Sequence, residues 1–293
     1  MRLWFFCLVT AITLNAAQAR TAQAQATQAQ ATQAKALAER GKYLVEGIAG
    51  CGNCHTPKGP NGPLPGMELA GNSVVEDGPA FRAVAANITP DKATGIGGWT
   101  DAQIARAIRE GIRPDGTLIG PPMPIGLYRG MADADVNAIV AYLRTVPSVS
   151  NKSEKSAYHI PLPPNYGPPV GQIAAPPSID RVAYGGYLAS AIGHCVECHS
   201  PLLPGGRRDF SKIGAGGQAF NGPWGTSVAA NITSSKARGL GDWSDADIER
   251  AIRQGISRDG HALQPPMGFA YYASISKPDM TALIAYLRTL PPS

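Results

Sequence analysis

Two five-residue stretches place a pair of thiols directly before an imidazole. They are Cys51–His55, which reads CGNCH, and Cys195–His199, which reads CVECH. Two cysteines three residues apart can bond the two vinyl groups of one porphyrin, and the next histidine can coordinate its iron, which is the attachment pattern of c-type haem. The motifs predict two covalently bound haem c groups, held by Cys51, Cys54, Cys195 and Cys198, with His55 and His199 on the metal.

Other uses of paired cysteines fit these spacings less well. A structural zinc site has its two C-x-x-C halves about 15–20 residues apart, whereas 140 residues separate Cys54 from Cys195. Disulfides suit an exported protein, but they give no reason for the histidine that follows each pair. We therefore expect no disulfide among these four cysteines.

Almost the whole chain is a tandem repeat with an offset of 144 residues. GKYLVEGIAGCGNCH (41–55) is matched by GGYLASAIGHCVECH (185–199), and AYLRTVP at Ala141 returns as AYLRTLP at Ala285. From Val84 to Pro124, 25 of 41 positions are identical without a gap. A period this long indicates duplication of a whole domain, because solenoid repeats have periods of 20–50 residues.

The repeat also selects a second iron ligand. If both sites are built alike, this ligand recurs 144 residues later, and Met123 maps onto Met267, each in the sequence PPM. Histidine–methionine ligation by His55 and Met123, and by His199 and Met267, is the resulting prediction. Met67, Met131, Met280, His194 and His261 fail this test and are the next candidates, and His159 lies in the linker.

The amino-acid composition along the chain predicts the boundaries between its segments. Residues 1–19 read as a secretory signal peptide ending in an A-x-A cleavage site, and the apolar run of about 12 residues is too short for a membrane anchor, which needs roughly 20. The remaining segments are an Ala/Gln-rich mobile leader (20–36), a first domain (37–148), a Pro-rich linker (149–180) and a second domain (181–293). We expect an exported protein with no transmembrane helix after processing.

Each repeat predicts helices separated by long Gly/Pro-rich loops. In each repeat, one helix leads into the cysteine motif. A second helix begins at a capping pattern, which is TDAQ (Thr100) in the first repeat and SDAD (Ser244) in the second. A third helix is marked in the first repeat by apolar residues at helical spacing: Val136, Ile139, Val140 and Leu143. The strand signal is weak, so the predicted fold class is all-α. The apolar stripes are thin for a domain of this length, and a buried haem supplies the missing core.

Charge excludes one class of partner. The formal net charge is +5, but the basic residues are dispersed, and four haem propionates would offset most of it. No nucleic-acid interface is expected.

On the basis of these motifs, the sequence resembles a tandem duplication of a class I c-type cytochrome. In particular, it resembles the cytochrome subunits of bacterial periplasmic dehydrogenases. The matching runs are GKYL…CGNCHTP, NITPDKATGIGGWTDAQIARAIREG, PPMP and DVNAIVAYLRTVP, with their second copies. The resemblance implies axial ligation by His55, Met123, His199 and Met267.

It further implies a periplasmic protein that relays single electrons and has no catalysis of its own. The donor would be a dehydrogenase, and the acceptor a cytochrome, an oxidase or a quinone-linked protein. Many cytochrome subunits of membrane-bound dehydrogenases have three haem domains, and this sequence has two motifs. The alternatives from other classes are a dihaem peroxidase, a thiosulfate-oxidising dihaem enzyme and a haem-based sensor, of which the peroxidase is the main rival.

Overall fold

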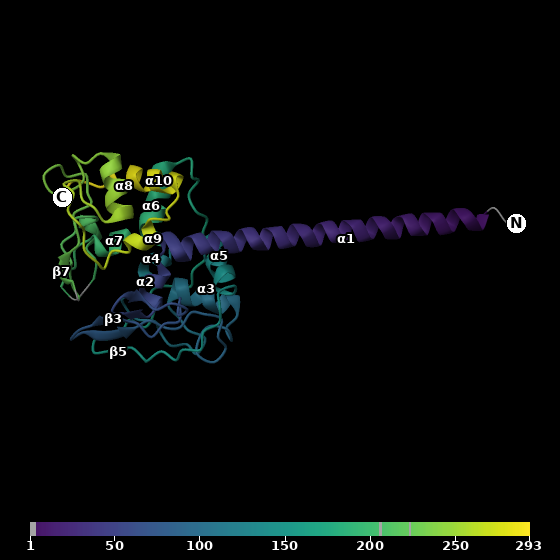
Figure 1. The fold of residues 1–293 in the computed structure, drawn as a ribbon, viewed down its shortest axis with the longest axis horizontal. Helices are drawn as coiled ribbons and strands as arrows, with labels where there is room; N and C mark the ends of the chain where they lie inside the picture. Colours follow the sequence, from purple (N-terminus) through teal and green to yellow (C-terminus); the bar gives the residue numbers. More distant parts are fainter. Residues whose placement is uncertain (1–3, 205–206, 223) are drawn as a thin grey trace.

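The computed structural model has two lobes, one from each repeat, and a long helix that projects from them (Figure 1). It describes residues 4–204, 207–222 and 224–293. The α-helices are α1 (Trp4–Tyr43), α2 (Cys51–His55), α3 (Asp101–Glu110), α4 (Ile125–Tyr128), α5 (Asp133–Leu143), α6 (Arg181–Tyr187), α7 (Cys195–Cys198), α8 (Asp245–Gln254), α9 (Phe269–Tyr272) and α10 (Lys277–Leu287). Two π-helical segments, η1 (Leu44–Ile48) and η2 (Leu188–Ile192), continue α1 and α6, and η3 (Phe210–Lys212) is a short 3-10 turn.

The fold class expected from the sequence, all-α, is wrong. Short strands occupy the loops between each cysteine motif and the next long helix: β1 (Lys58–Gly59), β2 (Gly62–Pro63), β3 (Val74–Asp77), β4 (Phe81–Val84), β6 (Ala219–Gly222) and β7 (Gly225–Val228), with β5 (Ala157–Tyr158) in the linker. They form three small antiparallel sheets, ordered β1-β2, β3-β4-β5 and β6-β7. Strands of two to four residues are too short to produce a visible alternation of apolar and polar residues, which is why the sequence pattern missed them.

The helical predictions agree with the structure at the capping patterns and at the last helix of the first repeat. Thr100 caps α3 through a capping box with Gln103, and Ser244 caps α8 through the same arrangement with Asp247. The apolar stripe of α5 is buried as expected from its spacing. Helix propensity, caps and periodicity therefore identify the main helices of both repeats.

Glycine allows two helix pairs to cross closely. A Cβ atom on Gly41 of α1 would lie 1.9 Å from the carbonyl oxygen of Ala138 in α5, and one on Gly185 of α6 would lie 1.9 Å from that of Ala282 in α10. Only a residue without a side chain permits this approach. The crossing positions the helix that leads into each cysteine motif against the last helix of its own repeat.

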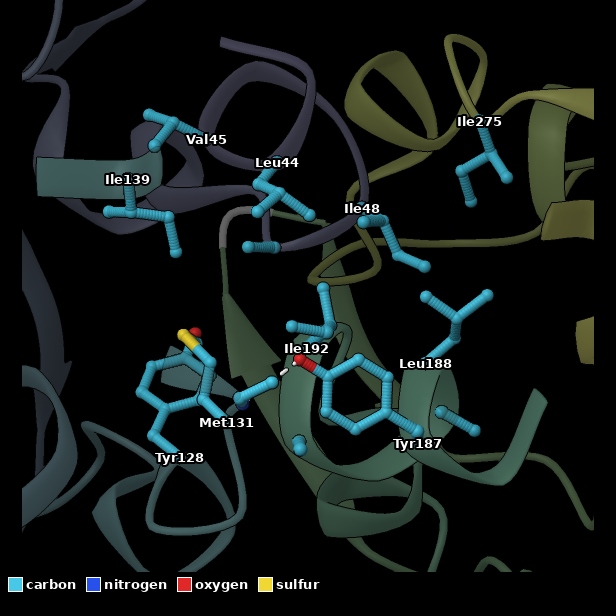
Figure 2. Close-up of a cluster of buried hydrophobic side chains, with 14 of the residues drawn as sticks. Leu44, Val45, Ile48, Tyr128, Met131, Ile139, Tyr187, Leu188, Ile192 and Ile275 are labelled. Atoms are coloured by element: carbon cyan, nitrogen blue, oxygen red, sulfur yellow. Dashed lines mark hydrogen bonds between the residues drawn. The ribbon is translucent and has the colours of Figure 1, made fainter. Parts of the chain in front are cut away.

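The buried core is continuous across the two repeats. Leu44 and Ile48 of η1 lie against Leu188 and Ile192 of η2, and Tyr128 and Tyr187 flank this cluster (Figure 2). η1 and η2 are the segments that immediately precede the two cysteine motifs. Their packing brings the two motifs to the interface between the lobes.

The N-terminal part of α1 extends away from both lobes (Figure 1). The leader expected to be irregular is helical, and residues 23–37 are exposed. The proposed signal peptide lies partly outside the described residues, since its first three positions are not described. Within residues 4–204, 207–222 and 224–293, no helix combines the length and the apolar character that crossing a bilayer demands.

Candidate functional site

Each cysteine motif is a short helix that follows a left-handed residue. Gly50 (φ 56°) precedes α2, and His194 (φ 41°) stands in the same place before α7. The positive φ turns the chain sharply out of the π-helical segment and starts a new helical turn at the first cysteine. A non-glycine residue rarely adopts this conformation, so the second repeat holds His194 against its backbone preference.

The two motif histidines are oriented by the same hydrogen bond. Nδ1 of His55 lies 2.7 Å from the carbonyl oxygen of Ala86, and Nδ1 of His199 lies 2.7 Å from that of Ala230. Because a carbonyl only accepts, Nδ1 carries the proton and Nε2 is left with a free lone pair. Burial lowers the pKa of both histidines, against the opposing effect of the carbonyl, and favours the neutral imidazole that binds metals.

The structure shows no disulfide bond among Cys51, Cys54, Cys195 and Cys198. Burial raises the pKa of Cys51 to about 12, that of Cys195 to about 11 and that of Cys198 to about 12, and it also raises that of Cys54. These thiols are therefore protonated at neutral pH, in apolar surroundings. Such surroundings suit an uncharged thioether bond to a porphyrin.

The second repeat brings three of its four predicted donors together around one cavity. Cys195, His199 and Met267 line it, and the other lining residues are apolar or aromatic: Ile48, Ala189, Ile232, Ile252, Tyr272, Ile275, Leu283 and Leu287. In the first repeat, Cys51 and Met123 pack against the same continuous core. A thiol pair, an imidazole with a free nitrogen and a thioether in apolar surroundings fit a covalently attached haem.

The methionines of the two PPM sequences lie on equivalent loops. Each loop contains a cis peptide bond between its prolines, Pro121–Pro122 and Pro265–Pro266. In each loop, the methionine carbonyl accepts a hydrogen bond from the backbone N–H of the residue two positions later. This residue is Ile125 in the first loop and Phe269 in the second. The two loops therefore have the same local structure around the candidate ligands.

The competing ligand candidates lie elsewhere. Met131 and Met280 are almost completely buried in the core, and His159 and His261 are exposed. His194 stacks edge-on against Tyr128 of the other repeat, with ring centroids 5.8 Å apart, and burial lowers its pKa to about 4. None of these five residues lines the cavity with Cys195 and His199.

The segment that leads into each cysteine motif packs against the methionine-side helix of the other repeat. α9 contacts η1, and α4 contacts η2. The Asn53 amide, inside the first motif, donates to the carbonyl of Pro266 in the second methionine loop at 3.2 Å. The pKa of Cys198 is raised by burial first, and Cys54 in the other motif adds to this increase. The two attachment motifs are therefore close neighbours across the interface.

Sequence reasoning missed the residues that join the lobes. The Tyr43 hydroxyl donates to Asp279 at 2.6 Å and accepts from the backbone N–H of Ser276 at 3.1 Å. The Tyr187 hydroxyl donates to Asp135 at 2.6 Å and accepts from the N–H of Ala132 at 3.1 Å. We call these two tyrosines and two aspartates the interlobe clasp. The sequence contains a signal that could have identified these four residues, because the two tyrosines are 144 residues apart and so are the two aspartates.

Comparison with known proteins identifies a matching family model and several relatives of this chain. The family model for cytochrome c matches residues 38–147. The chain is 34% identical over 272 residues to the fructose dehydrogenase cytochrome subunit of Gluconobacter japonicus, covering 86% of this chain and 52% of that protein. It is 30% identical over 275 residues to the cytochrome c subunit of the alcohol dehydrogenase (quinone) of Gluconobacter oxydans, covering 87% and 55%.

A relative of similar length is also matched. The diheme cytochrome c-type protein of Cereibacter sphaeroides is 31% identical over 266 residues, which cover 87% of this chain and 86% of that protein. By contrast, the chain spans about half the length of the fructose and alcohol dehydrogenase subunits.

Proposed function

Because this chain belongs to the c-type cytochromes and is an electron-transfer cytochrome, we propose that it is a periplasmic dihaem relay. It takes single electrons from a partner dehydrogenase and passes them to a downstream acceptor, which is a cytochrome, an oxidase or a quinone-linked protein. The proposed domains are residues 37–148 and 181–293, joined by the linker 149–180, after a signal peptide at 1–19 and a leader at 20–36.

The observation that carries this proposal is the packing of η1 against η2, the two segments that lead into the cysteine motifs. Cys51 and Cys54 would hold one haem, and Cys195 and Cys198 the second. His55 with Met123, and His199 with Met267, would supply the axial ligands. A haem with histidine and methionine ligands cycles between ferric and ferrous iron by one electron, and the thioether raises its reduction potential.

The protein's own contribution is to hold the donors and to exclude water. The carbonyls of Ala86 and Ala230 keep each histidine in the tautomer with Nε2 free. The apolar lining around His199 and Met267 disfavours the added charge of the oxidised site and favours the reduced state. η1 and η2 hold the two sites close together through a shared core rather than through a flexible link.

A relay and a peroxidase behave differently towards small ligands. With both axial positions taken by protein side chains, the resting protein should bind neither carbon monoxide nor cyanide readily. A peroxidase needs an open or displaceable position on one iron. The main rival function therefore requires that one methionine leave its iron.

The deciding experiment compares two reactions of the purified holoprotein. We expect reduction by a periplasmic dehydrogenase and its substrate, uptake of about two electrons in total, and reoxidation by a second cytochrome. The half-reduced protein is tested in parallel for steady-state peroxide consumption. Rapid peroxide turnover would overturn the relay proposal, and so would failure to accept electrons from every dehydrogenase tested while dithionite still reduces both haems.

A further inference from the structure

The third residue of the first cysteine motif is bonded to the other lobe. The Asn53 side-chain amide donates to the carbonyl of Pro266 at 3.2 Å, and Pro266 is the residue directly before Met267. A hydrogen bond to the adjoining peptide restricts the position of a residue whose side chain binds a metal. A side chain of the first motif is therefore in direct contact with the loop that carries the proposed ligand of the second iron.

The second residue of the same motif leaves space for the helix that follows this loop. Gly52 is buried, and a Cβ atom on it would lie 2.8 Å from the hydroxyl oxygen of Tyr271 in α9 and 3.2 Å from the ring carbon Cε1. A side chain at this position would displace the Tyr271 ring, because packed atoms do not approach one another so closely. α9 begins at Phe269, two residues after Met267. The packing of α9 against the first motif thus requires glycine at position 52.

The two repeats differ at these positions. Three residues make the contact, and each is replaced at the 144-residue offset: Val196 for Gly52, Glu197 for Asn53 and Leu127 for Tyr271. The larger motif residue, Val196, thus occurs together with the smaller helix residue, Leu127. The side chain of Glu197 has no N–H group with which to reproduce the bond made by Asn53. The amide bond at Pro266 is therefore particular to the loop of Met267.

We propose that Gly52 and Asn53 of the first motif are positioning residues for Met267, so that one lobe tunes the iron of the other. Gly52 admits Tyr271 and so fixes α9 behind the loop, and Asn53 holds the peptide in front of Met267. The inference rests on the proposed ligation by Met267 and gives these two residues a role beyond haem attachment in their own motif. A loop that is held less firmly weakens the thioether bond, and a weaker thioether lowers the reduction potential.

The test observes each iron separately, by nuclear magnetic resonance of the ferrous holoprotein. The methyl group of an iron-bound methionine lies over the porphyrin ring and gives a strongly upfield-shifted signal, so two such signals are expected. Met267→Ala assigns one of them by removing it. Asn53→Asp keeps the shape of the side chain without its N–H groups, and it should shift the Met267 signal and leave the Met123 signal in place. Lys58→Gln is the matched control and should move neither signal, because Lys58 donates to Oδ1 of Asn53, at 3.1 Å, and not to the loop.

Ligand exchange measures the size of the effect. Added imidazole replaces the methionine of a ferric haem at a rate limited by dissociation of the thioether from iron. The kinetic phase that Met267→Ala abolishes should be about fivefold faster in Asn53→Asp, which corresponds to one hydrogen bond of about 1 kcal/mol at 1.36 kcal/mol per factor of ten. Gly52→Val should accelerate the same phase. Gly52→Val combined with Tyr271→Leu, which copies the residue sizes of Val196 and Leu127, should restore the original rate.

The outcomes separate the ligation from the positioning role. If Met267→Ala removes neither methyl signal, the proposed ligation is wrong and this inference fails with it. If Met267→Ala removes a signal that Asn53→Asp and Gly52→Val leave unchanged in position and exchange rate, the ligation stands and the positioning role is overturned. A change confined to the Met123 signal overturns it as well, since the two residues would then act only on the haem of their own motif. Failure of Tyr271→Leu to rescue Gly52→Val overturns the part assigned to Gly52.

Discussion

Tyr43 of the first repeat and Asp279 of the second are joined by a 2.6 Å hydrogen bond, and Tyr187 and Asp135 repeat this bond in the opposite direction. Each tyrosine ends the helix that precedes a cysteine motif, and each aspartate lies in the first turn of the other repeat's last helix. Both aspartates are buried, so their carboxylates depend on these hydroxyls. The interlobe clasp therefore links each helix that precedes a cysteine motif to the last helix of the other repeat.

Removing one clasp hydroxyl should destabilise the protein measurably. Tyr187→Phe leaves the buried Asp135 with Arg40 as its remaining side-chain donor and leaves the N–H of Ala132 without its acceptor. We expect a loss of about 1–3 kcal/mol in the free energy of unfolding, measured by denaturant titration of the holoprotein. Tyr286→Phe, for which no side-chain hydrogen bond is seen among the described residues, is the matched control and should change the value by less than about 0.5 kcal/mol. Equal losses in the two variants would contradict the clasp.

The clasp also predicts a pH dependence in the alkaline range. Burial, and then the hydrogen bond to Asp279, raise the pKa of Tyr43 to about 12 from an ordinary value of 10.0. The folded state holds this proton more tightly than the unfolded state, so the stabilisation is complete below about pH 10 and is lost as pH rises towards 12. The unfolding free energy should decline over this window, and Tyr43→Phe should make the decline shallower. An identical slope in the variant would show that another group is responsible.

The number of haems is tested by mass. Four cysteines consumed as thioethers predict an intact mass equal to the processed chain plus two haems, with no thiol open to alkylation after unfolding. Cys198→Ala, which removes one thioether from the second motif, should leave the first haem attached. A mass with one haem, or alkylation of either cysteine pair in the unmodified protein, excludes the two-haem assignment.

Axial ligation is tested by replacing the two loop methionines singly. Met123→Ala or Met267→Ala should open one iron to water and lower its potential, because a thioether stabilises the ferrous state. The near-infrared band of methionine-bound ferric haem should fall by half in each variant. Met280→Leu conserves volume at a buried core position and should keep the full band while costing less than about 1.5 kcal/mol of stability. An undiminished band in Met267→Ala moves the assignment to the other candidates, beginning with Met67.

The candidate donors could be inferred without knowledge of the architecture around them. A thiol pair next to a histidine has few chemical uses, and an exact offset selects one methionine in each repeat, so the candidate donors follow from residue type and spacing. The capping boxes at Thr100 and Ser244 and the stripe on α5 follow from local helix chemistry. None of these inferences needs the relative position of the two halves.

The strands and the clasp required the structure for different reasons. β3 and β4 are four residues long, and β5 is a two-residue segment whose pairing partner is more than 70 residues away, so no local pattern marks it. Tyr43 and Asp279 are ordinary residues at a helix end and in a first helical turn. Their importance depends on how one lobe faces the other, which periodicity does not encode.

The reciprocal character of the clasp has a consequence for folding. The last helix of the first repeat, α5, has Ala132 at its N-cap position without a side-chain cap, and the hydroxyl that accepts the N–H of Ala132 comes from the second repeat. η1 and η2 likewise bury their apolar residues against each other. Neither half completes its own hydrogen bonding or its own core, so loss of one half exposes buried groups in the other. We therefore expect the two repeats to fold and unfold together, as one cooperative unit.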